Sequence, residues 1–416
     1  MNMLLRFFSV WNVVFLLAIV VLFLLVVYPM YSIFQASFIS AETGSFTLDN
    51  YLTIFSTRFY RRCLWNSVFL SGLATVFSVL IGVPFAFFTT RYRLPHASIL
   101  KTLGTLPLIL PTFIGAEAWL LLLGRNGILT QMFHAIGLNT PSIYGWKGVV
   151  LVYTLQFFPF VFLMVSAAIN SVDRSLEESA RNLGATPWRV FRTVTLPVVT
   201  PAIASGALIV FCMSVENFGV PTIIGNDYKV LAEQAYSEFV SEMGGNPSMA
   251  GALSTVLVLV TLLLTVLQKL WVERKNYAMS SLRPPEILPL SPWKTRLAWL
   301  FCAGVVFVSL APFMVVLVAA VTKTNGPVMY YGQFSLDNLA LALQAAPRPI
   351  INSFFLSTTA TVIGMVFGMA VSYIVVRRRG VTGYTLDLVM MLPLVIAGSV
   401  LGIALAATYN DGPVVL

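Results

Sequence analysis

Residues that could perform chemistry are scarce in this chain. It contains two histidines, His96 and His134, in different predicted loops, and three widely spaced cysteines, Cys63, Cys212 and Cys302, without a CxxC pair. These side chains predict neither a metal site nor a disulfide framework. No Gly-Lys dipeptide occurs, so the sequence lacks a phosphate-binding loop of the G-x-x-x-x-G-K-[ST] type. We therefore expect a protein without catalytic residues, cofactors or a bound metal.

The most informative feature is a polar segment between two apolar stretches. Residues 178–184 are Glu-Ser-Ala-Arg-Asn-Leu-Gly, and residues 194–197, after nine intervening positions, are Val-Thr-Leu-Pro. Asp173 or Ser175 can cap a helix start here, and Ser175 with Glu178 fits a capping box. Gly184 can end that helix in the left-handed conformation that other residues resist.

A second short helix is predicted after the glycine, with Thr186 as its cap and Pro187 as its first residue. Glu177 and Arg181 are expected one turn apart on the polar side of the first helix. Aliphatic and aromatic side chains form the other faces: Leu176, Ala180, Leu183, Trp188 and Phe191. This helix–glycine–helix element, residues 173–197, suits insertion into a groove on another protein. The alternative is an amphipathic loop on the bilayer surface.

Composition assigns the chain to the integral membrane proteins. Hydrophobic residues make up 58% of it and charged residues only 10%, which leaves too little polar surface for a soluble globule. Long apolar runs approach or reach the roughly 20 residues that a helix needs to cross a bilayer core. They are apolar on every face, which favours helices over barrel strands. We expect an all-α polytopic bundle of nine spans, centred near Leu22, Phe77, Ala116, Val161, Leu208, Val258, Phe307, Gly364 and Gly398.

Basic residues fall in alternate loops. The net charge of +9 comes from dispersed side chains rather than from a basic stripe, so nucleic acid is not an expected partner. The positive-inside rule places the N-terminus and the cation-rich loops in the cytoplasm. Those loops are 91–101, 174–192, 274–296 and 377–379. Arg58, Arg61 and Arg62 are an exception, because they lie on the predicted outer side. The first span is predicted to be an uncleaved anchor.

The sequence contains an internal repeat. Asn66-Ser67 recurs 286 positions later as Asn352-Ser353, and residues 46–50 recur as 334–338 with an offset of 288. Apolar similarity alone would not align asparagine, aspartate and serine together. We therefore predict two tandem copies of one membrane unit in the same orientation. The predicted parts are a six-helix unit over 1–272, a cytoplasmic linker over 273–294 and an incomplete second unit over 295–416.

Four polar side chains lie in or beside the predicted spans: Glu117, Gln156, Asn170 and Glu216. An ionised carboxylate facing lipid costs a few kcal/mol, so Glu117 is expected to face the bundle interior or an aqueous path. Glu216 is expected at the outer membrane edge. For Gln156 and Asn170, lining of such a path and hydrogen bonding between helices remain alternatives. Together the four are the candidate residues of a translocation path.

The polar segment resembles the EAA motif of ABC importer permeases, which combines Glu-Ala-Ala, a later glycine and a terminal hydrophobic-x-Leu-Pro. Ser179 stands where the first alanine is usual, and the other positions match. The resemblance implies that the element is the coupling helix that seats in a cleft of a cytoplasmic ATPase. The candidate coupling residues are Glu177, Glu178, Ser179, Ala180, Gly184, Trp188, Leu196 and Pro197.

Nearly the whole chain is also similar to the ferric-iron branch of that family, in which two permease units are fused. Residues 216–221 resemble its acidic-Phe-Gly-x-Pro stretch, with Asn217 where an aspartate is more usual. The resemblance implies a multi-pass protein of the bacterial inner membrane. It also implies two partners, a separate and dimeric ABC ATPase and a periplasmic substrate-binding protein. Ferric iron, sugar phosphates, phosphonates and thiamine remain alternatives for the cargo.

Other functions stay open at this point. Because the second unit is incomplete, the chain can also be interpreted as a truncated remnant that does not transport. An ion-coupled secondary transporter is a weaker alternative, since apart from Glu117 the spans carry few ionisable residues. A membrane-embedded enzyme has the least support, because no His/Asp, Ser/Lys or metal constellation is present.

Overall fold

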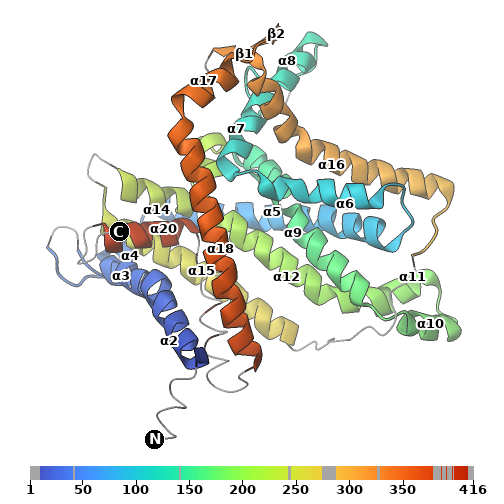
Figure 1. Ribbon diagram of the computed structural model, residues 1–416, viewed down its shortest axis with the longest axis horizontal. Helices are drawn as coiled ribbons and strands as arrows, with labels where there is room; N and C mark the ends of the chain where they lie inside the picture. The colour runs from blue at the N-terminus through green and yellow to red at the C-terminus, as the bar shows by residue number, and fades with distance from the viewer. Residues whose placement is uncertain are drawn as a thin grey trace, which may run out of the picture. The chain divides into compact units, whose positions relative to one another are not determined.

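A computed structural model describes residues 10–40, 43–139, 142–241, 245–273, 287–325, 328–377, 386, 390, 396 and 398–410. Helices predominate among them (Figure 1). The chain divides into two compact units, each built from separate stretches of sequence. The first comprises Met1–Leu52, Ala235–Val258 and Leu317–Leu416, and the second comprises Thr53–Gln234 and Leu259–Val316. The predicted tandem division at 272 and 294 stays a prediction.

The structural unit formed by Thr53–Gln234 and Leu259–Val316, which is not the predicted second copy, carries most of the sequence motifs. Its elements are α5 (Arg58–Arg91), α6 (Ala97–Thr105), η2 (Leu106–Ile109), α7 (Thr112–Leu123), α8 (Ile128–Ala135), α9 (Trp146–Ser171), α10 (Arg174–Asn182), α11 (Pro187–Val190), η3 (Phe191–Thr195), α12 (Leu196–Val215) and α13 (Gly219–Ile224). The end of α15 (Pro247–Glu273) and most of α16 (Pro292–Ala320) complete it.

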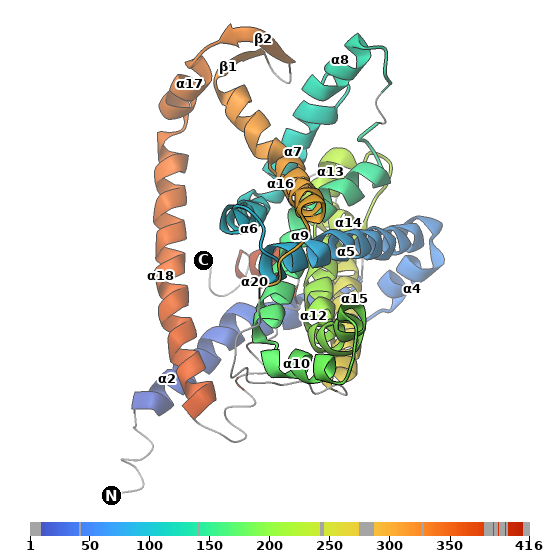
Figure 2. The ribbon, with the colours of Figure 1, turned by 90° about the vertical axis from the view of Figure 1, so that its right-hand side faces the viewer.

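Helices α5, α9 and α12 form the core of this unit and lie side by side (Figures 1 and 2). They meet at the buried Val161 of α9. A Cβ on Gly82 of α5 would lie 2.9 Å from the Val161 Cβ, and one on Gly206 of α12 would lie 2.8 Å from the Val161 Cα. Both positions therefore need glycine, whose missing side chain lets helix backbones approach closely. Phe85 of α5 adds an edge-to-face contact with Phe162 at 5.0 Å between ring centroids.

The third predicted span, centred at Ala116, is broken. Its two helical parts, Ala97–Ile109 and Thr112–Ala135, meet at 105°. Pro107 and Pro111 flank the bend, and neither has an N–H with which to continue the helical hydrogen-bond ladder. The prolines leave Leu110 extended between two helix ends, so the segment around the predicted centre is not one continuous helix.

The first unit holds the remaining elements: α2 (Val10–Leu22), η1 (Phe23–Val27), α3 (Tyr28–Ser37), β1 (Thr322–Asn325), β2 (Val328–Phe334), α17 (Asp337–Ala345), α18 (Pro347–Arg377) and α20 (Gly398–Tyr409). Two further helices, α4 (Asp49–Ser56) and α14 (Leu231–Val240), extend across the boundary between the units. Ile33 of α3 packs against Ile403 and Ala404 of α20. The Tyr409 hydroxyl donates to the Leu24 carbonyl at 2.6 Å.

The repeated sequence adopts the same local structure in both copies. The short helices α4 and α17 begin at the equivalent aspartates, Asp49 and Asp337. The asparagine that follows each aspartate binds a carbonyl near the end of the preceding spanning helix. Asn50 donates to Ser37 at 2.9 Å, and Asn338 donates to Thr322 at 2.8 Å. The repeat therefore extends from sequence to side-chain contacts.

Seven helices in the described part of the chain are long and apolar enough to cross a membrane, and the bent pair adds an eighth when counted as one span. The seven long helices contain seven of the nine predicted span centres. Helix α20, with 12 residues, is about 18 Å long and too short to span alone. The rest of the ninth predicted span lies outside the described residues. The all-α prediction also missed one short hairpin, in which β1 pairs antiparallel with β2.

Candidate functional site

The helix–glycine–helix element forms much as its capping residues predict. Asp173 is the cap of α10, and its side chain accepts from the Ser175 N–H at 2.8 Å. Gly184 follows α10 with a φ of +82°, in the left-handed region. The Ala185 N–H donates back to the Ala180 carbonyl at 3.1 Å, which closes the helix end. The predicted capping box between Ser175 and Glu178 is wrong, because Asp173 fills that role.

The second half of the element begins as the predicted α-helix and then changes to a π-helical turn. The Thr186 side chain accepts from the Arg189 N–H, and Pro187 is the first residue of α11. The π-helical turn η3 follows, with the Leu196 N–H donating to the Phe191 carbonyl. Pro197 comes next and cannot donate, which favours such a departure from the α-helical ladder. The Leu-Pro pair of the motif therefore marks the junction between the element and the spanning helix α12.

Glu177 is buried rather than exposed, so the prediction that it lies on a polar face is wrong. Arg91, the last residue of α5, donates to Glu177 Oε2, and the Thr195 hydroxyl donates to Oε1 at 2.9 Å. These three side chains, which we call the Glu177 latch, come from α5, α10 and η3. A buried carboxylate requires such partners, since burying it unpaired would cost several kcal/mol.

The outer surface of the element carries exposed apolar side chains. Leu183 is 87% exposed and Trp188 is 68% exposed. Trp188 stacks on Phe191 with 5.5 Å between ring centroids, and Phe191 in turn packs edge-on against Phe87 of α5 at 5.2 Å. The exposed indole is therefore connected to a spanning helix through aromatic contacts. Such a supported aromatic side chain suits a protein interface.

The remaining motif residues take distinct positions. Glu178 is half-exposed and pairs with Arg174, one turn earlier on α10, at 2.5 Å. Ser179 is exposed, whereas Ala180 is half-buried. Leu196 and Pro197 are half-buried at the start of α12. The two consecutive glutamates thus have different roles, since Glu177 fixes the element and Glu178 remains at its surface.

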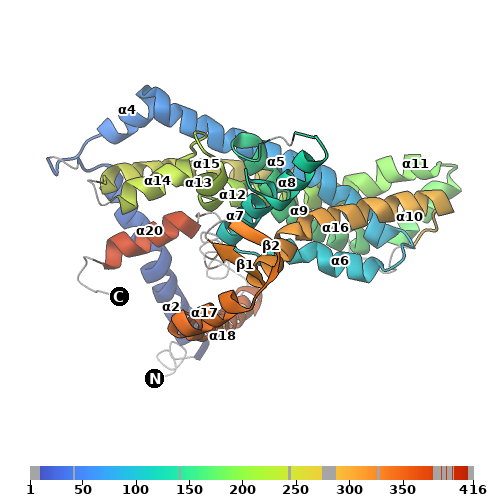
Figure 3. The same ribbon diagram turned by 90° about the horizontal axis from the view of Figure 1, so that it is seen from above.

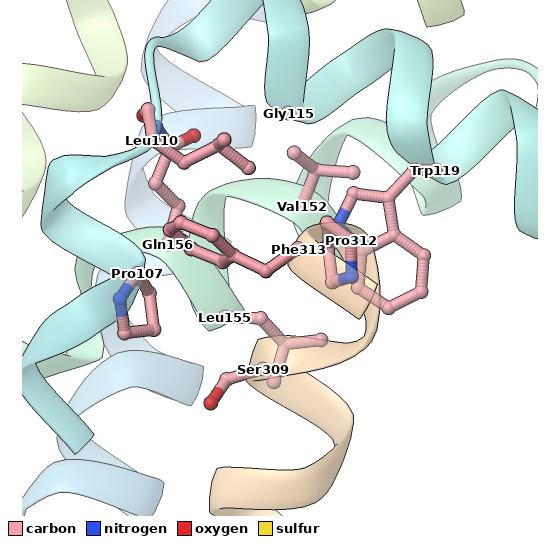
Figure 4. A pocket seen from close by; sticks show the side chains of 10 residues that line it. All are labelled: Pro107, Leu110, Gly115, Trp119, Val152, Leu155, Gln156, Ser309, Pro312 and Phe313. Atoms are coloured by element: carbon pink, nitrogen blue, oxygen red, sulfur yellow. The ribbon is translucent and has the colours of Figure 1, made fainter. Parts of the chain in front are cut away.

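Gln156 is the candidate path residue that the structure places in an interior site. It lines a small cavity between α9, η2, α7 and α16, together with Trp119 and Phe313 (Figure 4). Its Nε2 donates to the Leu110 carbonyl at 3.1 Å, which satisfies an acceptor left open by the broken span. The buried Oε1 has no hydrogen-bond partner among the described residues. Gln156 therefore makes a bond between elements and borders this cavity, while its part in a translocation path stays a prediction.

The other three candidates do not join Gln156 in one site. Glu117 on α7 and Asn170 on α9 are exposed in this chain. Glu216 is half-buried and ends α12, where its backbone N–H donates to Cys212. Asn170 lies three residues before Asp173, whereas Glu216 lies at the opposite end of α12 from the helix–glycine–helix element. A single polar path through these four positions stays a prediction.

A second polar network, missed by the sequence analysis, holds the segment before α14. Asn66 Nδ2 donates to the Lys229 carbonyl at 2.8 Å, and the Ser67 hydroxyl accepts from the Leu231 N–H at 2.8 Å. Lys229 pairs with Glu233 at 2.6 Å. Burial raises the pKa of Tyr228 in the same segment. The sequence signal for this network is the polarity of the Asn-Ser pair at the start of an apolar run.

Residues 78–276 match the family of binding-protein-dependent transport system inner membrane components. The molybdenum transport system permease protein ModB of Escherichia coli is 31% identical over 212 residues, which cover 48% of this chain and 91% of ModB. The chain belongs to this family. It is accordingly a multi-pass membrane protein, and the segment recognised as an EAA motif lies within the matched region.

Two longer relatives match over 95% of this chain. They are the ferric transport system permease protein FbpB of Actinobacillus pleuropneumoniae, 29% identical over 412 residues, and the putative ferric transport system permease protein FbpB 1 of Haemophilus influenzae, 27% identical over 416 residues. The chain spans 58% and 63% of their respective lengths. A solved bacterial ABC transporter that imports alginate shares the fold, with a TM-score of 0.52 at 23% identity over 63% of this chain and 94% of its own.

The Glu177 latch yields a prediction about stability. Glu177→Ala should lower the free energy of unfolding in detergent by about 3–5 kcal/mol, because it removes the buried carboxylate that pairs with Arg91. Glu178→Ala is the matched control and should change it by about 0.5 kcal/mol or less, because the Arg174 pair is solvent-exposed. Denaturant titration monitored by tryptophan fluorescence measures both. Equal losses in the two variants would show that the latch does not hold the element.

Proposed function

We propose that this chain is the membrane-spanning permease part of an ATP-driven importer, and that its helix–glycine–helix element receives a cytoplasmic ATPase dimer. Membership of a binding-protein-dependent transport family supports an importer. The observation that carries the proposal is the combination of exposed Leu183 and Trp188 with the buried Glu177 latch behind them. An element that is apolar outside and ion-paired inside offers both a docking surface and a rigid attachment.

The latch gives the ATPase a mechanical connection to the membrane helices. A displacement applied at Trp188 reaches α5 through Phe191 and Phe87, and also through Glu177 and Arg91. The π-helical turn carries the same displacement into α12. Because α5 and α12 both pack against α9 at glycine positions, the three helices would move as a packed group rather than slide independently. The permease itself carries out no chemistry, and ATP hydrolysis belongs to the partner.

We further propose ferric iron as the cargo, delivered by a periplasmic binding protein. The support is that both relatives matching over 95% of the chain are named for ferric transport. A periplasmic partner agrees with the alginate transporter, which has been solved in complex with its loaded periplasmic protein. The orientation follows from the positive-inside rule, with the N-terminus and the helix–glycine–helix element in the cytoplasm.

Docking of the ATPase can be tested at Trp188. Trp188→Ala should weaken the affinity of the chain for the cognate ATPase by roughly 30-fold or more in co-purification, as expected for loss of a central aromatic anchor. The matched control is Trp293→Ala, which removes an indole that is 63% exposed and lies outside the element. Measurements of ATPase affinity in detergent compare the two variants. Unchanged affinity in Trp188→Ala would contradict the proposed docking surface.

Orientation can be tested by cysteine labelling, because the three native cysteines are buried. Ser179→Cys, at an exposed position of α10, should react with a membrane-impermeant maleimide only after cells are lysed. Leu138 follows α8 and is 55% exposed. Leu138→Cys should react in intact spheroplasts, because this position lies on the predicted outer side. Labelling of Ser179→Cys in intact spheroplasts would invert the topology and exclude cytoplasmic docking.

The cargo can be tested by uptake. Cells that contain the full transporter should accumulate radiolabelled ferric iron, and the Trp188→Ala variant should lose most of this accumulation because the ATPase no longer docks. Radiolabelled molybdate serves as the control cargo, since ModB is a relative of comparable identity. Uptake of molybdate rather than ferric iron would replace the proposed cargo while leaving the importer assignment intact.

A further inference from the structure

The predicted linker is attached to the end of α5 by backbone hydrogen bonds. Tyr92, directly after α5, is extended and pairs in parallel with Leu288. The Leu288 N–H donates to the Arg91 carbonyl at 2.9 Å, and the Arg93 N–H donates to the Leu288 carbonyl at 3.1 Å. Two such bonds between segments nearly 200 residues apart hold Leu288 against the end of α5.

Arg91 is the residue at which this attachment meets the Glu177 latch. Its carbonyl accepts from Leu288, while its guanidinium donates to Glu177. The half-buried Leu288 side chain lines the same cavity as Arg91, Glu177 and Thr195. Leu288 of the linker therefore lies beside the residues that hold the helix–glycine–helix element. A shift of Arg91 would alter both its bond to Leu288 and its bond to Glu177.

The attachment also positions the beginning of α16. This helix starts at Pro292, four residues after Leu288, and the Thr295 hydroxyl donates to the Leu290 carbonyl at 3.3 Å. Farther along, Phe301 packs edge-on against Phe88 of α5 at 5.9 Å. The start of α16 lies at the same end of this unit as α10 and α11 (Figures 1 and 3). Little chain remains between the bonded linker and the helix, so α16 must follow a displacement of Leu288.

We infer that Leu288 is a positioning residue that connects the helix–glycine–helix element to α16, the first helix of the predicted second copy. Movement of the element reaches Arg91 through Glu177, and reaches α16 through the backbone bonds between Arg91 and Leu288. A single ATPase contact would thereby act on helices of both predicted copies. The role in transport rests on the proposed function, whereas the connection itself does not.

Hydrogen exchange tests the connection in the 416-residue chain without any partner. Glu177→Ala should speed amide exchange at Leu288 by about tenfold, the size expected for weakening one hydrogen bond. Thr195→Val removes one hydroxyl from the latch and should also speed exchange at Leu288, by a smaller factor than Glu177→Ala. It replaces Glu177→Ala in the test if that variant folds poorly. Glu178→Ala is the matched control and should leave Leu288 unchanged, because its partner is Arg174.

Unchanged exchange at Leu288 in both latch variants would overturn the inference, whatever the ATPase experiment shows. Equal acceleration in Glu178→Ala would also overturn it, because the effect would then be general loosening. Loss of the proposed function would instead appear as unaltered ATPase affinity in Trp188→Ala, with the exchange result intact. The two failures are therefore distinguishable.

Coupling efficiency provides the readout that a merely structural role would not change. Leu288→Pro removes the N–H that bonds to Arg91, and the ratio of ferric iron transported to ATP hydrolysed should fall in the reconstituted transporter. Leu288→Ala keeps that N–H and should retain the ratio. A ratio that falls equally in both variants would assign Leu288 to packing alone and contradict its role in coupling.

Discussion

The buried ion pair of Glu177 is the interaction on which the arrangement of this membrane protein depends. A carboxylate loses its hydration when it is buried, and only a cation together with a further donor compensates for that loss. Arg91 and Thr195 supply both, and they come from α5 and from the turn before α12. One side chain on a short surface helix thereby fixes that helix to two membrane helices. The same arginine also holds the linker through its carbonyl.

Membrane burial places a second constraint on the helices that receive this attachment. Lipid offers no hydrophobic drive for helix association, so close packing and interhelical bonds must hold them together. The glycines at 82 and 206 allow backbone contact at Val161, and Gln156 satisfies the carbonyl that the broken span leaves open. The glycines act where two helix backbones approach each other, and Gln156 acts where a span is broken. The core beneath the element is therefore tightly packed, which suits transmission of a displacement.

The local features of the element could be predicted from sequence, and its long-range contacts could not. Gly184 and Thr186 act within a few residues of their own positions, so residue type and spacing were sufficient. Glu177 looks as polar as Glu178 in the sequence, and its burial depends on Arg91, which is 86 residues away. Most spans followed from hydropathy, but the 105° bend near Leu110 did not, because proline spacing suggests a break without giving its angle.

The π-helical turn between Phe191 and Thr195 has a geometric consequence for the orientation of the exposed Trp188. Each residue added to an α-helix turns the chain by about 100°, and a π turn accommodates one extra residue without disturbing the helix that follows. The direction in which Trp188 points relative to α12 therefore depends on the geometry of this turn, which joins α11 to α12.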